Sequence, residues 1–196
     1  VVSNNEGIGW GATYQHDGAN ALQHPSTSSV RNTSVEVLEH ISNIFHDRLE
    51  LITDSAGAGR FRGGVGIRRD VSFIADSEII SMKKKTKTSG WGLNGGRADS
   101  KNKMIIWPGT DKEKHVGMYR TFMKKGESFQ NYSAGGGGWG NPYAREIERI
   151  IDDIKNGYIS RESAEKDYGL IVKDDYTYEE KEERLEFIKK NFKKFF

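Results

Sequence analysis

Residues 135–142 read Gly-Gly-Gly-Gly-Trp-Gly-Asn-Pro, and they separate two kinds of sequence. Four consecutive glycines lose much conformational entropy on folding, so they make sense where backbone must pass tightly against another surface. Trp139 then supplies an apolar anchor, and Asn141 can cap the helical segment that opens after Pro142. The stretch therefore predicts a close-packed junction, with a flexible linker as the plain alternative.

Two further glycine clusters lie upstream, at residues 57–66 (Gly-Ala-Gly-Arg-Phe-Arg-Gly-Gly-Val-Gly) and 90–96 (Gly-Trp-Gly-Leu-Asn-Gly-Gly). The first is neither a Walker A loop nor a dinucleotide fingerprint, because no Gly-Lys-Ser/Thr follows and it runs into a strand. Two interpretations stay open for it. It is a glycine hairpin or bulge in a sheet, or it meets an anion through Arg60, Arg62 and backbone N–H groups.

Short β-type runs punctuated by glycine fill the region before residue 143. The pattern predicts strands at 48–53, 65–75 (one strand or a strand pair), 78–82, 103–107, 116–123 and 128–132. A helix-like apolar run covers 35–45, and the 78–82 strand follows 65–75 within hairpin distance. The fold class is therefore α+β: a mixed or antiparallel β region over 1–143, followed by a helical segment over 144–196.

The C-terminal segment has clear helical signals. One apolar stripe with helical spacing consists of Ile147, Ile150, Ile151 and Ile154. Gly157 is placed to end that helix, and Ser160 to cap the next one. Thr177 and Glu180 have capping-box spacing, so the last helix is expected to begin there, with Tyr178 on its apolar face.

Composition excludes several classes of protein. The chain has 196 residues, 23 of them glycine, and Lys+Arg 30 against Asp+Glu 28 gives a net charge of +2. This balance predicts no nucleic-acid partner. Without cysteine there are no disulfides, thiolate metal sites or thiol nucleophile. No apolar stretch of membrane-spanning length and no leader is visible, and with the balanced charge we expect no membrane partner.

His16, Asp17 and His24 form the best polar group for chemistry, since His and Asp serve as acid, base or metal ligand. On a strand, however, the neighbours His16 and Asp17 would point to opposite faces. No HExxH spacing or nucleophile elbow occurs. Asp152 and Asp153 are expected on a solvated helix face. The residues alone thus predict no complete active site.

Five blocks, taken in order, resemble hydantoinase B-type proteins. They are Asp17-Gly18 with Asn-Thr-Ser-Val-Glu-Val-Leu-Glu at 32–39, the cluster at 55–66, Trp-Gly-Leu-Asn-Gly-Gly at 91–96, the run at 135–142, and Asn-Gly-Tyr-Ile-Ser with Asp-Tyr-Gly over 156–169. Ser34 stands where the family commonly has Pro. The blocks span roughly residues 10 to 172.

The resemblance implies a cytoplasmic, heteromeric enzyme. The family includes N-methylhydantoinase B subunits, the corresponding part of 5-oxoprolinases, and subunits of acetone and acetophenone carboxylases. A hydantoinase A-type partner binds ATP and activates a small-molecule substrate by phosphorylation. The blocks belong to the C-terminal part of such a subunit, and the upstream half carries a His/Asp-rich metal motif. ATP and a divalent metal are therefore expected outside this chain, which alone is expected to be inactive.

Within that family the reaction is ATP-dependent carboxylation of a ketone or hydrolysis of a cyclic amide. The site prediction has two parts: catalytic His16, Asp17 and Arg60, and substrate-binding His24, Asn32, Gly59 and Gly63. No metal ligand is assigned to this chain. The alternative is a non-catalytic scaffold subunit that assembles the complex through its glycine-Trp surfaces and C-terminal helix.

Overall fold

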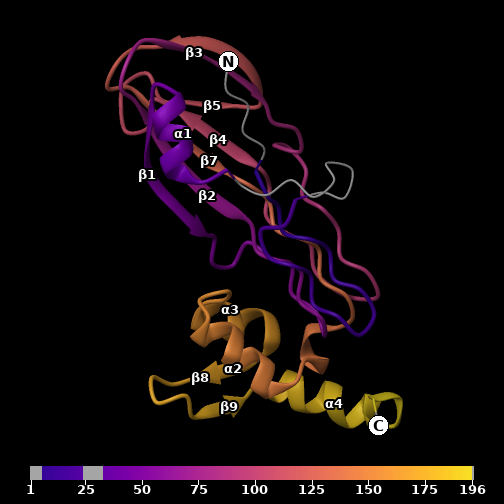
Figure 1. The fold of residues 1–196 in the computed structure, drawn as a ribbon. Coiled ribbons are helices and arrows are strands. Elements are labelled where there is room, and N and C mark those ends of the chain that lie inside the picture. The colour runs from indigo at the N-terminus through magenta and orange to yellow at the C-terminus, as the bar shows by residue number, and fades with distance from the viewer. Residues whose placement is uncertain (1–5, 24–32, 196) are drawn as a thin grey trace.

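The fold has a β-sheet region at one end and a helical region at the other, joined by long extended segments (Figure 1). The computed structural model describes residues 6–23 and 33–195. Its elements are α1 (Val35–Ile41), β1 (Ile44–Leu51), β2 (Ile67–Phe73), β3 (Ser77–Met82), β4 (Lys103–Ile106), β5 (Lys114–Val116), β6 (Met118–Met123), β7 (Ser128–Tyr132), the 3-10 turn η2 (Pro142–Ala144), α2 (Ile147–Lys155), α3 (Arg161–Tyr168), β8 (Leu170–Val172), β9 (Tyr178–Glu180) and α4 (Glu182–Phe195).

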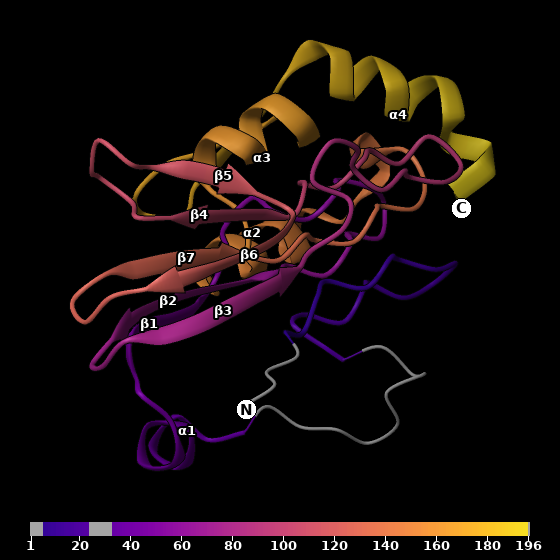
Figure 2. The same ribbon diagram turned by 90° about the horizontal axis from the view of Figure 1, so that it is seen from above.

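The larger sheet is antiparallel, with strand order β1-β2-β7-β4-β5. Strand β2 alternates buried and half-buried residues, as expected of a strand with one face on a core. A second, two-stranded sheet of β3 and β6, here called the β3–β6 ribbon, lies over the larger sheet (Figure 2). Its Ile79 and Tyr119 pack on a buried cluster of Met104, Ile106 and Val116.

The α+β class and the antiparallel sheets confirm the sequence prediction, but two local predictions are wrong. The helix-like run ends at Ile41, and Ile44 and Phe45 belong to β1, where Ile44 pairs with Phe73 of β2. Strand β3 pairs with β6 and not with β2. Both errors arise because apolar spacing over a few residues does not distinguish a helix from a strand or name the strand's partner.

The three glycine clusters meet in the middle of the molecule and pack backbone against backbone. A Cβ on Gly63 would lie 1.8 Å from the carbonyl oxygen of Gly136, and one on Gly136 would lie 1.8 Å from that of Trp10. Backbone hydrogen bonds join the segments, including Gly64 N–H to Trp10 O and Gly136 N–H to Gly64 O. The predicted close-packed junction is thus confirmed. None of residues 135–138 has a positive φ, so lack of space is what requires glycine there.

The helical region has its own core, made of Ala58, Ile150, Ile159, Ala164, Tyr168, Leu170 and Val172. Its boundaries follow the predicted signals. Asn141 caps the 3-10 turn by accepting a hydrogen bond from Tyr143 N–H, and Ser160 accepts one from Ser163 N–H at the start of α3. Gly157, after α2, has φ +71. Because Ala58 comes from the first glycine cluster, this core also fixes the helices to the central segments.

The predicted capping box at Thr177 and Glu180 is wrong. Residues 178–180 form β9, which pairs with β8, and α4 begins only at Glu182. Thr177 donates to Asp175 Oδ1 in the turn of this hairpin. In the described ranges, no helix is both long and apolar enough to cross a membrane.

Candidate functional site

A polar hollow of about 310 Å³ lies where the N-terminal segment meets the helical region. His16 and Asp17 line it from one side, and Arg145, Arg149 and Asp152 from the other. Residues 13 and 16 exchange backbone hydrogen bonds across a tight turn, so this segment is not a continuous strand. The expected separation of His16 and Asp17 on a strand therefore does not apply, and both residues line the same hollow.

Arg145 is the centre of the hollow's charge network. Its Nη1 and Nη2 donate to the two carboxylate oxygens of Asp17 at 2.8 Å each, and Nη2 also donates to Asp153 at 2.7 Å. Arg62 pairs with the other oxygen of Asp153 at 3.1 Å. Two buried guanidinium groups thus neutralise two carboxylates, the condition under which burying charge is tolerated.

Asp153 corrects the expectation that the Asp152-Asp153 pair lies on a solvated face. Its side chain is only 7% exposed because it faces Arg62 and Arg145, whereas Asp152 is exposed. Both partners lie outside α2: Arg62 belongs to the first glycine cluster, and Arg145 lies just before the helix begins. A sequence pattern within one helix carries no sign of such a contact.

The network fixes the ionisation of Asp17. Burial alone would raise the pKa of this carboxyl, but hydrogen bonds from the Arg145 side chain and the Arg62 backbone, with the charge of Arg145, lower the pKa below its ordinary value. Despite its burial, Arg145 has a raised pKa, because it bonds to Asp17 and lies beside Asp153. Asp17 is therefore an anion at neutral pH, far from the pKa near 7 that suits a general base.

Acid should weaken the fold through Asp17. Because the pKa of Asp17 is lower in the folded state, the unfolded chain takes up the proton first as the pH falls. Its stabilising contribution is complete above the ordinary pKa of 3.8 and is lost as the pH falls through the folded-state pKa. The free energy of unfolding can be measured with denaturant between pH 6 and pH 2, which is ~2 units either side of that value. It should fall less steeply with acid in Asp17→Asn than in the wild-type chain.

Asp99 provides a control of opposite sign. Burial raises the pKa of Asp99, so between 3.8 and that raised pKa the folded state holds more protons and the Asp99 contribution improves with acid. Asp99→Asn should therefore steepen the loss of stability in acid. If the free energy of unfolding falls equally steeply with acid in the wild-type chain and in both variants, the pKa directions given for Asp17 and Asp99 are wrong.

The remaining predicted residues are placed as follows. Arg60 lies beside the network, since its carbonyl accepts a hydrogen bond from Arg145, and its guanidinium lies 5.7 Å from the ring centre of Phe61. Gly59 and Gly63 belong to the central backbone packing, where a Cβ would overlap main-chain atoms. His24 and Asn32 lie outside the described residues. The structure thus brings together His16, Asp17 and Arg60 around Arg145.

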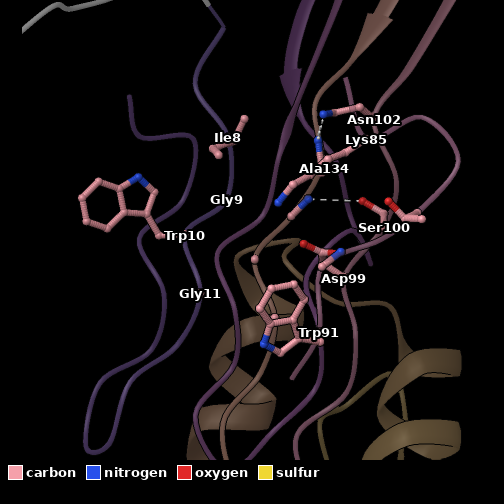
Figure 3. A pocket seen from close by; sticks show the side chains of 15 residues that line it. Ile8, Gly9, Trp10, Gly11, Lys85, Trp91, Asp99, Ser100, Asn102 and Ala134 are labelled. Atoms are coloured by element: carbon pink, nitrogen blue, oxygen red, sulfur yellow. Dashed lines mark hydrogen bonds between the residues drawn. The ribbon is translucent and has the colours of Figure 1, made fainter. Parts of the chain in front are cut away.

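A second cavity, of about 420 Å³, is lined by the second and third glycine clusters and by residues 8–11, and it was not predicted (Figure 3). Main chain of residues 9–11 and 135–137 forms its walls, and polar groups come from Lys85, Asp99 and Ser100. Figure 3 shows the Trp91 indole next to Asp99, whereas the Trp10 indole turns away from that group. We call this space the glycine cavity.

The polar residues of the glycine cavity are held by the framework itself. Asp99 accepts a hydrogen bond from Gly90 N–H, which offsets part of the burial that raises its pKa. Asn102 accepts one from Ala134 N–H at 2.7 Å, and Ser100 one from Gly135 N–H at 3.3 Å. The only sequence signal for them was a polar run directly after a glycine block, which is also typical of a loop.

No part of the described chain forms a metal site of the usual kind. Within residues 6–23 and 33–195, His, Asp and Glu side chains form no group of three or more that could hold a metal ion. In the polar hollow, guanidinium groups contact the carboxylate oxygens of Asp17 and Asp153. The glycine cavity, in contrast, offers Lys85, Asp99 and Ser100 beside a main-chain wall, an arrangement that can bind a small polar molecule.

The framework identifies the class of protein. Residues 1–142, which include all three glycine clusters, match a family model described as hydantoinase B/oxoprolinase, and the chain belongs to that family. An uncharacterised protein of Methanocaldococcus jannaschii is 35% identical over 146 residues, covering 74% of this chain and 26% of that protein. Caprolactamase subunit beta of Pseudomonas jessenii is 30% identical over 152 residues, covering 70% of this chain and 25% of that subunit.

Solved structures share the fold. The nucleotide-free structure of an acetone carboxylase superposes with a TM-score of 0.76 at 21% identity, over 96% of this chain and 30% of that one. The ATP-dependent caprolactamase from Pseudomonas jessenii superposes with a TM-score of 0.72 at 25% identity, over 87% of this chain and 31% of that one. The chain thus spans about a quarter of the length of the sequence relatives named above.

Proposed function

We propose that this chain forms the C-terminal portion of a hydantoinase B-type subunit in an ATP-dependent, multi-subunit cytoplasmic enzyme. The family match supports this proposal, as do relatives named as subunits of caprolactamase and acetone carboxylase. The portion of the subunit that precedes this one supplies a divalent metal. A hydantoinase A-type partner binds ATP, so both cofactors lie outside the chain.

The enzyme acts on a small molecule, either by hydrolysing a cyclic amide or by carboxylating a ketone. The observation that carries this proposal is the glycine cavity, whose volume of about 420 Å³ suits a small substrate. Its main-chain walls are held by interlocking hydrogen bonds, so a substrate would meet a preformed surface. Asp99 lines this cavity, and burial raises the pKa of its carboxyl, which makes it our candidate for acid–base contact with the substrate.

The polar hollow has a supporting role in the same proposal. Arg145 donates hydrogen bonds to the Asp17 carboxylate and to the backbone carbonyl of Arg60. Because Arg60 belongs to the first glycine cluster, the hollow helps to position that cluster. His16 and Arg60 remain our candidates for direct contact with substrate or partner. Gly59 and Gly63 act through the shape of the wall.

Reconstitution with a hydantoinase A-type subunit and the preceding portion of the B-type subunit tests the function. Asp99→Asn should lower kcat/KM at least about tenfold, as expected when a positioned acid or base is lost. Arg60→Ala should also reduce turnover with little loss of assembly. Glu148→Gln, on the exposed face of α2, is the control. ATP hydrolysis should be followed with a hydantoin, and separately with acetophenone plus bicarbonate.

A scaffold role is the second candidate, because the buried ion pairs of the polar hollow serve structure by themselves. Truncation after Val172 would not separate the two candidates. Arg184 of α4 is buried and donates to the carbonyl oxygens of Tyr168 and Arg145, so losing α4 would disturb the hollow as well. Point variants decide: full activity in both Asp99→Asn and Arg60→Ala would favour the scaffold.

A further inference from the structure

The outer face of the β3–β6 ribbon is an exposed apolar surface. The register pairs residues 78 with 122, 80 with 120 and 82 with 118, which places these six side chains on one face. Four of them are large, apolar and open to solvent: Ile80 (61% exposed), Met82 (78%), Met118 (71%) and Phe122 (75%). The opposite face, with Ile79 and Tyr119, packs on the larger sheet. Such a two-faced ribbon is typical of an element that packs between two bodies.

The sequence segment that contains the ribbon is strongly basic. Residues 77–125 contain 12 Lys and Arg against 4 Asp and Glu, a formal charge of +8, whereas the rest of the chain carries −6. Exposed Lys84 follows one end of the ribbon, and exposed Lys124 and Lys125 follow the other. Between them, Arg120 pairs with Glu78 at 2.6 Å. An apolar centre with a charged rim is the usual anatomy of a protein interface.

We propose that the outer face of the β3–β6 ribbon docks the portion of a hydantoinase B-type subunit that this chain does not span. The occupant presents an apolar patch surrounded by Asp and Glu, complementary to the lysine rim. This inference rests on the proposed function.

Chain length argues for this occupant over a second copy. The same fold occupies 30% of the acetone carboxylase chain and 31% of the caprolactamase chain, so more than two thirds of each chain lies outside it. A polypeptide of that size can cover the outer face of the ribbon, where four large apolar side chains are exposed to water. A second copy would bring the exposed lysines at the ribbon ends against those of the other copy, and like charges disfavour that contact.

Binding to a defined polypeptide tests the inference. The probe is the Methanocaldococcus jannaschii relative expressed without the 146 residues that match this chain. The wild-type chain should bind it, more weakly as salt is raised. The double variant Ile80→Glu/Phe122→Glu should bind at least tenfold more weakly with an unchanged unfolding midpoint. Val37→Glu/Ile41→Glu, on the exposed face of α1, is the matched control and should bind like wild type.

A second pair of variants tests the rim without touching the apolar centre. Lys84→Glu/Lys124→Glu should weaken binding and reduce its salt dependence, because these lysines are exposed and can be reversed without loss of packing. Lack of binding by the wild-type chain, or equal binding by the ribbon variants, would overturn the inference. The inference would also be overturned if the wild-type chain forms a homodimer, or binds vesicles with one third phosphatidylserine, and the ribbon variants do not.

The same samples separate this inference from the proposed function. If the ribbon variants bind normally and the reconstituted enzyme containing them turns over substrate, the docking inference is wrong and the proposed function stands. If assembly depends on the ribbon but the complex hydrolyses no ATP with any of the substrates, the docking inference stands and the proposed function is wrong.

Discussion

Gly136→Ala is expected to cost about 3 kcal/mol of folding free energy, a large part of the ~5–15 kcal/mol that stabilises a typical domain. The new Cβ would lie 1.8 Å from the carbonyl oxygen of Trp10 and 2.5 Å from Gly11 N, both main-chain atoms. A side chain could rotate away from such an overlap, but here a whole hydrogen-bonded segment would have to move. Denaturant unfolding followed by Trp fluorescence measures the loss.

Gly11→Ala is the matched control, because it adds the same methyl group in the segment that contacts Gly136. Its Cβ would meet nothing closer than 3.8 Å, and its φ is not in the left-handed region. We expect a change within about 0.5 kcal/mol. If both variants unfold alike, the glycines matter for chain flexibility and not for space.

Arg145→Met should destabilise the chain by about 3–5 kcal/mol, since it leaves buried carboxylate without its partner. Asp17 would lose both of its charge-assisted hydrogen bonds to Arg145, and Asp153 would keep only Arg62. The carbonyl of Arg60 would lose a donor as well. The free energy of unfolding at neutral pH is the quantity to compare.

Arg149→Met is the control for this second prediction. Arg149 also approaches Asp17, but at 3.5 Å and with a side chain that is 42% exposed. Exposed pairs of this kind contribute up to about 1 kcal/mol. Adding Asp153→Asn to Arg145→Met should recover part of the loss, because it removes one of the uncompensated charges. Additive losses in the double variant would contradict a shared network.

The sequence predicted those parts of the fold that depend on local signals. Gly157 and Ser160 mark helix boundaries through backbone conformation and capping, which need only neighbouring residues. The stretch 178–180 went wrong because its pairing with β8 outweighs a capping-box spacing. Likewise, no local signal pairs β3 with β6 across more than 30 residues of intervening chain.

The candidate site was predicted in outline only, for a related reason. His16 and Asp17 were selected for their chemistry, but Arg145, which sets the pKa of Asp17, lies 128 residues away. Asp99 was missed because its raised pKa comes from burial, and no spacing within the sequence records burial. Charge pairing and desolvation between remote segments are properties of the folded chain.

The glycine cavity has walls that point mutation cannot reshape. Any residue larger than glycine at 135 or 136 collides with neighbouring main chain, so the floor keeps one contour whatever else changes. Evolutionary tuning of what fits there must then work through the few side chains that reach the opening, such as Lys85 and Trp91. Related enzymes with unlike substrates can share such a floor and differ at its edge.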